Sequence, residues 1–215
     1  ERPYRANQAR TYYYGSGLLE FYGRHKERQA LAEFIEQTDD KLLLWLVTGD
    51  GGVGKSRLAF ELCREYRDKG YRAGFLSQNT LLSPNWAPEQ PTLIVIDYAA
   101  ERIDQLKRFL DLYEVSASWR FPVRILLLER PASLSEERLK QTHDFDYVTY
   151  QLLQYGAALE LQPLSKPDLL AIMKYILRRP PARQLPADKK LWQGLLKVDP
   201  KCRSLFAAYL AEALR

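Results

Sequence analysis

The chain has 215 residues, of which 46% are hydrophobic and 27% are charged. These proportions are ordinary for a packed globular domain, and they exclude a disordered, collagenous or coiled-coil chain. Only two Cys are present, which excludes a disulfide framework and favours a reducing compartment, so we expect a cytoplasmic protein.

The net charge of +5 is unevenly distributed along the chain. Residues 171–215 carry ten Lys or Arg against three Asp or Glu, whereas the rest is slightly acidic. A basic end of this kind can contact nucleic acid, nucleotide phosphates or an acidic neighbouring domain. The longest apolar run, at 42–47, is too short to cross a membrane. Because the sequence starts at Glu1 and stops within a helical pattern, we expect a segment of a larger protein.

Residues 1–22 show no clear periodicity, and we interpret them as a connecting segment. Beyond them, patterns typical of helices and of buried strands alternate. Helices are predicted at 24–37, 56–69 and 101–113, and strands at 41–48, 72–77, 92–97, 123–129 and 157–161. Strands that are apolar on both faces and separated by helices predict a five-stranded parallel α/β sheet.

The strand patterns stop after Pro163. Three further helices are predicted at 168–177, 189–198 and 202–214. The predicted organisation is therefore a linker at 1–22, an α/β core at 23–163 and a small all-helical lid at 164–215.

The most specific motif lies between the first predicted strand and the helix after it. It has the pattern G-x-x-x-x-G-K-[ST] and reads Gly49-Asp50-Gly51-Gly52-Val53-Gly54-Lys55-Ser56. Glycines let such a loop turn its backbone N–H groups toward phosphate oxygens, and the dipole of the following helix also faces the anion. Lys55 would reach the β- and γ-phosphates, and the Ser56 hydroxyl would bind Mg²⁺. The predicted nucleotide site continues to Arg57.

Two carboxylates follow the third predicted strand. Asp97 ends that strand, which we expect to lie beside the phosphate-loop strand, and an Asp there holds Mg²⁺, usually through water. The alternative for Asp97 is a cap on the next helix. Glu101 is a candidate general base for the attacking water, and its alternative is a solvated Glu in the first turn of a helix.

An arginine follows the fourth predicted strand. Because the carboxyl ends of parallel strands line the ligand crevice of open α/β sheets, Arg130 is a candidate sensor of a γ-phosphate. The alternative is a local ion pair with Glu129.

In this order, the motifs resemble the nucleotide-binding domain of STAND NTPases (signal-transduction ATPases with numerous domains), a branch of the AAA-like P-loop proteins. The resemblance extends from Phe21 to the C-terminus. The first matching segment, Phe21-Tyr22-Gly23-Arg24, resembles a family motif that lies near the adenine, so Gly23 and Arg24 are implied to contact nucleotide. Glu101 corresponds to an acidic position of NACHT-type members.

Two later segments carry the same resemblance. Residues 161–165 resemble the family's L-x-P-L-S junction into the lid, which implies that Pro163 lies at the nucleotide. Arg203-Ser204-Leu205 resembles a later x-P-L motif, with Ser204 in place of the proline.

The resemblance implies a switch that binds ATP or ADP with Mg²⁺ and hydrolyses ATP slowly. It also implies self-association through this domain, with effector and sensor domains outside the segment and no membrane contact. The strand motif around Asp97 resembles that of bacterial members, many of which act in antiphage defence.

Other functions remain open from the sequence. A DNA-handling ATPase would use the basic C-terminal residues Arg178, Arg179, Arg183, Lys189, Lys190, Lys197, Lys201 and Arg203. Because aromatic residues are scarce among these positions, the sequence favours a solvated helical face. A module that binds nucleotide without hydrolysing it is a further alternative. A small-molecule kinase is disfavoured by the segment 161–165 and by the helical C-terminal part.

Overall fold

The computed structural model describes residues 19–77, 86–102, 112, 116–130, 155–179 and 185–215. These residues form two compact units, each described here by itself. One unit, the sheet unit, comprises His25–Asp50 and the described part of Leu58–Leu161. The other, the helical unit, comprises the described residues up to Arg24 together with Gly51–Arg57 and the described part of Gln162–Arg215.

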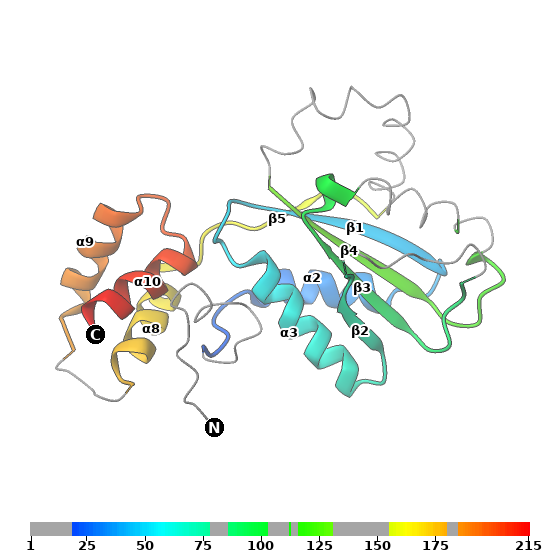
Figure 1. Ribbon diagram of the computed structural model, residues 1–215, viewed down its shortest axis with the longest axis horizontal. Helices are drawn as coiled ribbons and strands as arrows, with labels where there is room; N and C mark the ends of the chain where they lie inside the picture. Colours follow the sequence, from blue (N-terminus) through cyan, green and yellow to red (C-terminus); the bar gives the residue numbers. More distant parts are fainter. Residues whose placement is uncertain (1–18, 78–85, 103–111, 113–115, 131–154, 180–184) are drawn as a thin grey trace. The chain divides into compact units, whose positions relative to one another are not determined.

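The sheet unit is built on five parallel strands (Figure 1). In chain order they are β1 (Leu42–Thr48), β2 (Arg72–Phe75), β3 (Thr92–Asp97), β4 (Val123–Glu129) and β5 (Leu159–Glu160). Their order across the sheet is β2-β3-β4-β1-β5, and every neighbouring pair is parallel. The predicted five-stranded parallel sheet is confirmed.

One expectation about the sheet is wrong. β4, and not β3, lies beside β1, with Thr48 opposite Glu129. The strand that ends in Asp97 is therefore separated from the phosphate-loop strand by one strand. Hydrophobic patterns indicate that a strand is buried on both faces, but they do not specify which strand is its neighbour.

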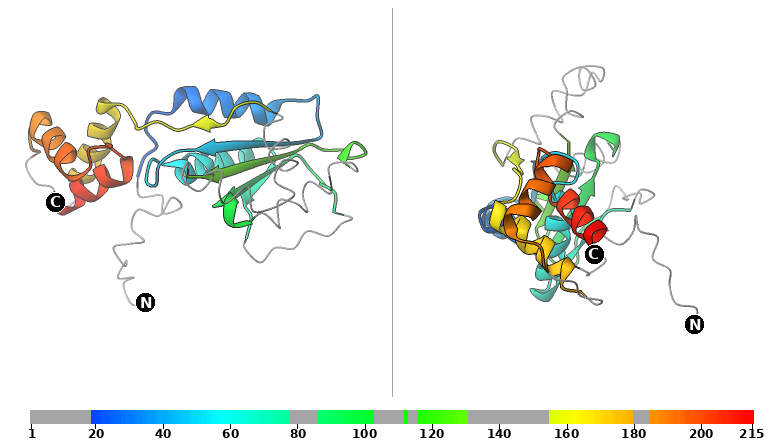
Figure 2. Two further views of the ribbon diagram at one scale, coloured as in Figure 1. Left: turned by 90° about the horizontal axis from the view of Figure 1, so that it is seen from above. Right: turned by 90° about the vertical axis from the view of Figure 1, so that its left-hand side faces the viewer.

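The apolar pattern of the strands follows from burial on both faces. Alternate residues of β1, β3 and β4 join one core cluster with Ala99, Leu112 and Trp119. On β1, Trp45 is one of the residues that point to the other face, and its ring lies 5.5 Å from the ring of Phe34. Phe34 belongs to α2 (His25–Glu36), which is followed in sequence by β1. Figure 2 shows α2 on one side of the strands.

A buried arginine joins α2 to the sheet. Arg124 interrupts the apolar run of β4 and is fully buried. Its guanidinium donates hydrogen bonds to the carbonyls of Phe34, Gln37, Lys41 and Val123. Burial lowers the pKa of this guanidinium from its usual value. Because carbonyls left free at the end of a helix need donors, Arg124 substitutes for solvent at the end of α2.

The helical unit contains three helices, α8 (Lys166–Leu177), α9 (Asp188–Val198) and α10 (Ser204–Leu214). Their apolar faces form a single cluster, from Leu169 and Met173 on α8 to Leu195 on α9 and Ala211 on α10. Leu19 and Tyr22, from the segment before α2, pack against the same cluster. The Ser165 side chain caps α8 by accepting a hydrogen bond from the N–H of Asp168.

The predicted helices and strands agree with those observed to within a few residues wherever the chain is described. Residues 1–18, 80–85 and 103–111, which carry part of the linker, a loop and most of the predicted helix 101–113, lie outside the described residues. Within the described part of the chain, no helix is both long enough and apolar enough to cross a membrane. The predicted domain boundaries at 22/23 and 163/164 stay predictions.

Candidate functional site

The phosphate loop continues from β1 and is followed by α3 (Lys55–Asp68). Gly52 and Gly54 adopt left-handed φ values of 84° and 105°. A Cβ on Gly52 would lie 3.3 Å from the Cβ of Leu205. Glycine is therefore required at Gly52 by both the backbone and its neighbour.

Three consecutive carbonyls of this loop accept hydrogen bonds from the rest of the helical unit. Arg203 Nη1 donates to the Gly51 carbonyl at 3.4 Å. The Gly52 carbonyl accepts from both Ser204 Oγ and the Leu205 N–H, each at 3.1 Å. Arg24 Nη2 donates to the Val53 carbonyl at 2.9 Å. These bonds fix the conformation of the loop within the helical unit.

Gly23 and Arg24 lie on the segment that precedes α2, and both have a φ of 65°. The Arg24 side chain is buried against the phosphate loop. A Cβ on Gly23 would come within 2.8 Å of Asp168 Oδ2 on α8. The structure thus gives Arg24 a direct part in shaping the loop, and it places Gly23 against α8.

The start of α10 is held by an ion pair. Asp199 accepts from Arg203 Nε and Nη2, with Nη2–Oδ1 at 2.9 Å, and from the Arg203 backbone N–H at 2.7 Å. The Asp199 side chain is 2% exposed. Burial alone would raise the pKa of this carboxyl, but the hydrogen bonds from Arg203 outweigh it and lower the pKa. The Arg203 guanidinium also lies 4.2 Å from the centre of the Phe206 ring.

Lys55, Ser56 and Arg57 form the first turn of α3. Lys55 is buried, with 9% of its surface exposed. Arg57 Nη2 donates to the Leu19 carbonyl at 2.7 Å, which joins this turn to the segment before α2. The predicted nucleotide residues from Gly51 to Arg57 therefore lie in one unit with Gly23 and Arg24. Pro163 belongs to the same unit and is exposed.

The other predicted site residues follow strands of the sheet unit. Asp97 ends β3, and Glu101 is an exposed residue of η1, a short 3-10 helix at Ala99–Arg102. Between them, Tyr98 has a left-handed φ of 56° and accepts, through its carbonyl, a hydrogen bond from the N–H of Glu101. The chain thus turns sharply after Asp97, which places Glu101 one turn beyond the end of the strand.

Glu129 and Arg130 do not form the ion pair that was the alternative for Arg130. The Glu129 carboxylate, which is buried, accepts from the N–H groups of Arg130 and Ala100 at 2.7 and 2.8 Å. The exposed Arg130 guanidinium instead lies 5.7 Å from the centre of the Tyr98 ring. Glu129 therefore joins the end of β4 to η1.

Sequence reasoning missed two features of this site. It considered Glu129 only as an ion-pair partner of Arg130, although a carboxylate buried at a strand end needs donors and so signals a local cap. It also interpreted residues 203–205 only by comparison with the x-P-L motif of the resembling family. The structure shows instead that Ser204 makes a hydrogen bond to the loop that a proline cannot make.

Among the residues that the structure describes, no three His, Cys, Asp or Glu side chains gather as a metal site. The predicted Mg²⁺ ligands belong to different units, Ser56 to the helical unit and Asp97 to the sheet unit, and their use as a metal site stays a prediction.

Comparison with known proteins places the chain in a family. Residues 20–158 match the AAA ATPase domain family. No curated protein matches the sequence. The fold is similar to that of the Aeropyrum pernix ORC2 protein, solved as ADPNP–ADP complexes, with a TM-score of 0.57, 14% identity and coverage of 91% of this chain and 62% of that one.

Two bacterial structures show the same likeness. A Thermotoga maritima RuvB structure has a TM-score of 0.58 and 15% identity, covering 91% of this chain and 64% of that one. Domain III of the Thermotoga maritima replication initiation protein DnaA has a TM-score of 0.50 and 12% identity, covering 95% of both chains. The chain spans less than two thirds of the ORC2 and RuvB structures. At these identities the likeness shows the fold, and the family match shows that the chain belongs to the AAA ATPase domain family.

Proposed function

We propose that the chain is the nucleotide-binding switch domain of a signal-transduction ATPase of the STAND type. The observation that carries the proposal is the set of hydrogen bonds between the phosphate loop and other residues of the helical unit. Arg24 and residues 203–205 bind three consecutive loop carbonyls. Because the loop and the start of α10 share these hydrogen bonds, a ligand that reshapes the loop also acts on α10.

Several residues fit a magnesium-bound nucleoside triphosphate. The N–H groups of the loop and the Lys55 ammonium group would hold the phosphates, while Ser56 and Asp97 would hold the metal. ATP with Mg²⁺ supplies a terminal phosphate and a charge that ADP lacks. Gly23, Arg24 and Pro163 are proposed to line the remaining part of the nucleotide site.

The sensing and hydrolytic residues are proposed at the strand ends of the sheet unit. The Arg130 guanidinium is exposed and lies over Tyr98, so it can move to an added negative charge without breaking a buried ion pair. Glu101 would accept a proton from the attacking water. Glu129 holds the N–H of Ala100 and so helps to position the turn that carries Glu101.

The switch itself requires a part that moves. We propose that residues 164–215 act as a lid and that residues 203–205 are its contact with the loop. Only contacts that differ between the ATP and ADP states can shift the population of the lid. In the complete protein, this shift would drive self-association and activate an effector domain, as in cytoplasmic antiphage systems.

Isothermal titration calorimetry tests the nucleotide site. Lys55→Ala should abolish measurable ATP binding in the presence of Mg²⁺, because the loop loses its one ammonium group at the phosphates. Lys26→Ala, which removes an exposed lysine of α2, should bind as the unmodified chain does. Retention of ATP affinity by Lys55→Ala would refute the site.

A second measurement separates binding from switching. Arg130→Ala should keep its affinity for ADP and lose preference for a nonhydrolysable ATP analogue. Mass photometry of the full-length protein should show assembly with that analogue and less assembly with ADP. Equal losses for the two nucleotides would remove Arg130 from the sensing role, and an unchanged mass distribution would refute the switch.

A further inference from the structure

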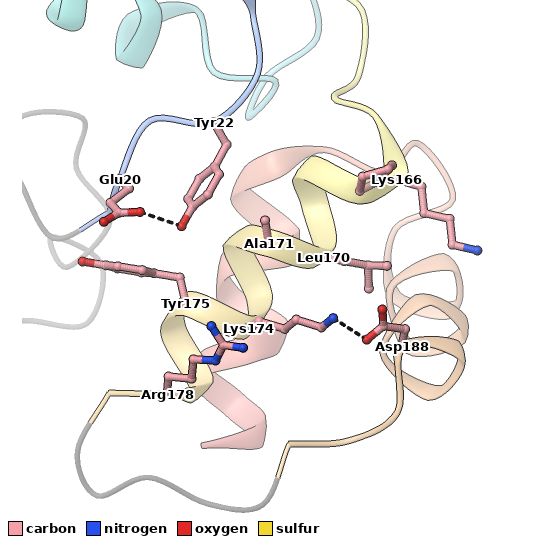
Figure 3. A pocket seen from close by; sticks show the side chains of 10 residues that line it. Glu20, Tyr22, Lys166, Leu170, Ala171, Lys174, Tyr175, Arg178 and Asp188 are labelled. Carbon is pink, nitrogen blue, oxygen red and sulfur yellow. Dashed lines mark hydrogen bonds and ion pairs between the residues drawn. The ribbon is translucent and has the colours of Figure 1, made fainter.

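A pocket of about 710 Å³ lies on the outer side of α8, within the helical unit (Figure 3). None of the nucleotide-site residues proposed above lines it. Its walls come from α8, from the N-terminal end of α9 and from the segment before α2. The lining residues that matter for its chemistry are Glu20, Tyr22, Lys166, Lys174, Tyr175, Arg178 and Asp188, and the Tyr22 hydroxyl donates a hydrogen bond to Glu20 at 2.9 Å.

Three of the lining side chains are cations on one helix. Lys166 and Lys174 belong to α8 and Arg178 is its C-cap residue, so the three cations are spread over roughly 18 Å along the helix. Lys174 Nζ lies 2.6 Å from Asp188 Oδ1, and the dashed line in Figure 3 marks this ion pair. Arg178 is exposed, and no ion pair of Arg178 is seen among the described residues. Three cations against the two carboxylates Glu20 and Asp188 leave the pocket lining with a net charge of +1.

Aromatic rings lie directly beside these cations. Tyr22 and Tyr175 meet edge to face at the pocket, with ring centres 6.4 Å apart. The Arg179 guanidinium lies 5.1 Å from the centre of the Tyr175 ring. The Lys166 ammonium group lies 5.1 Å from the centre of the Trp192 ring on α9. Tyr175 and Trp192 thus come from the basic C-terminal part itself, and tertiary structure adds Tyr22 from the segment before α2.

We propose that this pocket binds single-stranded nucleic acid. Cations along a groove hold the phosphate backbone, and adjacent rings stack with bases; together these features are typical of surfaces that bind single strands without sequence preference. An acidic peptide needs the cations but gains little from the rings, so the paired tyrosines favour a nucleic acid. The proposal is independent of the nucleotide switch, because it uses other residues.

Fluorescence anisotropy of a labelled oligothymidylate of about 20 nucleotides tests the proposal with the full chain. Binding should weaken between about 50 and 200 mM NaCl, because phosphate contacts release counterions. Lys174→Ala and Arg178→Ala should each weaken binding and reduce the salt slope by about 0.7. Asp188→Asn should strengthen binding, since it frees Lys174 from its ion pair.

Matched variants separate this pocket from general electrostatics. Lys197→Ala removes the same charge from an exposed position of α9 outside the pocket and should leave the affinity unchanged. Tyr175→Ala should cost about five- to 100-fold in affinity through lost stacking, whereas Tyr175→Phe should retain it. Lys55→Ala should bind the oligonucleotide with unchanged affinity, even though it is expected to lose ATP binding.

Three results would overturn the proposal. The first is no binding at low salt by a chain that circular dichroism shows to be folded. The second is an equal effect of Lys197→Ala and Lys174→Ala, which would indicate diffuse attraction. The third is competition by polyglutamate as strong as by DNA, with no effect of Tyr175→Ala, which would indicate a surface for acidic proteins.

Discussion

Ser204 occupies the position at which the resembling family carries proline, and the structure predicts what restoring that proline would do. Ser204 is the first residue of α10, a position where the helix makes no hydrogen bond from the N–H and therefore tolerates proline, which has none. The preceding residue, Arg203, has φ −76° and ψ 138°, the extended conformation that a following proline requires. The backbone of this chain is therefore already compatible with proline at 204.

The expected magnitude follows from two opposing terms. Ser204→Pro loses the hydrogen bond from Oγ to the Gly52 carbonyl, which is worth about 1 kcal/mol. It gains about 0.4–1 kcal/mol because proline restricts the unfolded chain. The free energy of unfolding should therefore change by less than about 1 kcal/mol. Ser204→Ala, which has only the loss, should be destabilised by about 1 kcal/mol.

The neighbouring position provides the contrast. The Leu205 N–H donates to the Gly52 carbonyl, so Leu205→Pro removes a backbone donor and the leucine contact with the loop. It should cost about 2–3 kcal/mol, as a proline does where its N–H was bonded. Urea unfolding followed by Trp192 fluorescence measures all three variants. If Ser204→Pro proves as damaging as Leu205→Pro, the account of how α10 meets the phosphate loop is wrong.

Three further predictions concern the loop, its ion pair and a buried thiol. Gly52→Ala should be destabilised more than Gly70→Ala in urea unfolding, because both glycines have φ near 85° but only Gly52 has a neighbour within 4 Å of the added Cβ. Asp199→Asn should lower the free energy of unfolding by about 2 kcal/mol at neutral pH. The pKa of Asp199 is lowered in the folded state, so its contribution to the free energy of unfolding is present above about pH 4 and is lost as pH falls through the folded pKa. The free energies of unfolding of the variant and the parent, measured in urea, should therefore converge in acid. Burial raises the pKa of the Cys63 thiol to about 11. Alkylation of Cys63 at pH 8 should therefore be far slower in the folded chain than in urea. Equal alkylation rates would contradict the burial of this thiol.

The phosphate loop and the sheet could be predicted because local patterns specify them. The glycine spacing at 49–54 and the Lys55-Ser56 pair follow a fully apolar strand, and only a tight, anion-binding turn explains that combination. The bounds of strands such as β1 and β3 were predicted correctly because burial on both faces leaves an uninterrupted apolar run. Asp97 and Arg130 could be named because parallel strands end at one edge of their sheet.

Other properties depended on contacts between distant parts of the chain. The position of β4 between β1 and β3 is set by packing of whole strands, which periodicity does not record. The roles of Arg124 and Glu129 arise from carbonyls and N–H groups that only the folded backbone brings to them. The same is true of Ser204, whose partner lies 152 residues away. The sequence determined which segments form the phosphate loop and the sheet, because those choices depend on neighbouring residues. The tertiary structure decided what holds the loop and which rings lie beside the basic side chains of α8, because polar groups and rings find such partners only when remote segments pack together.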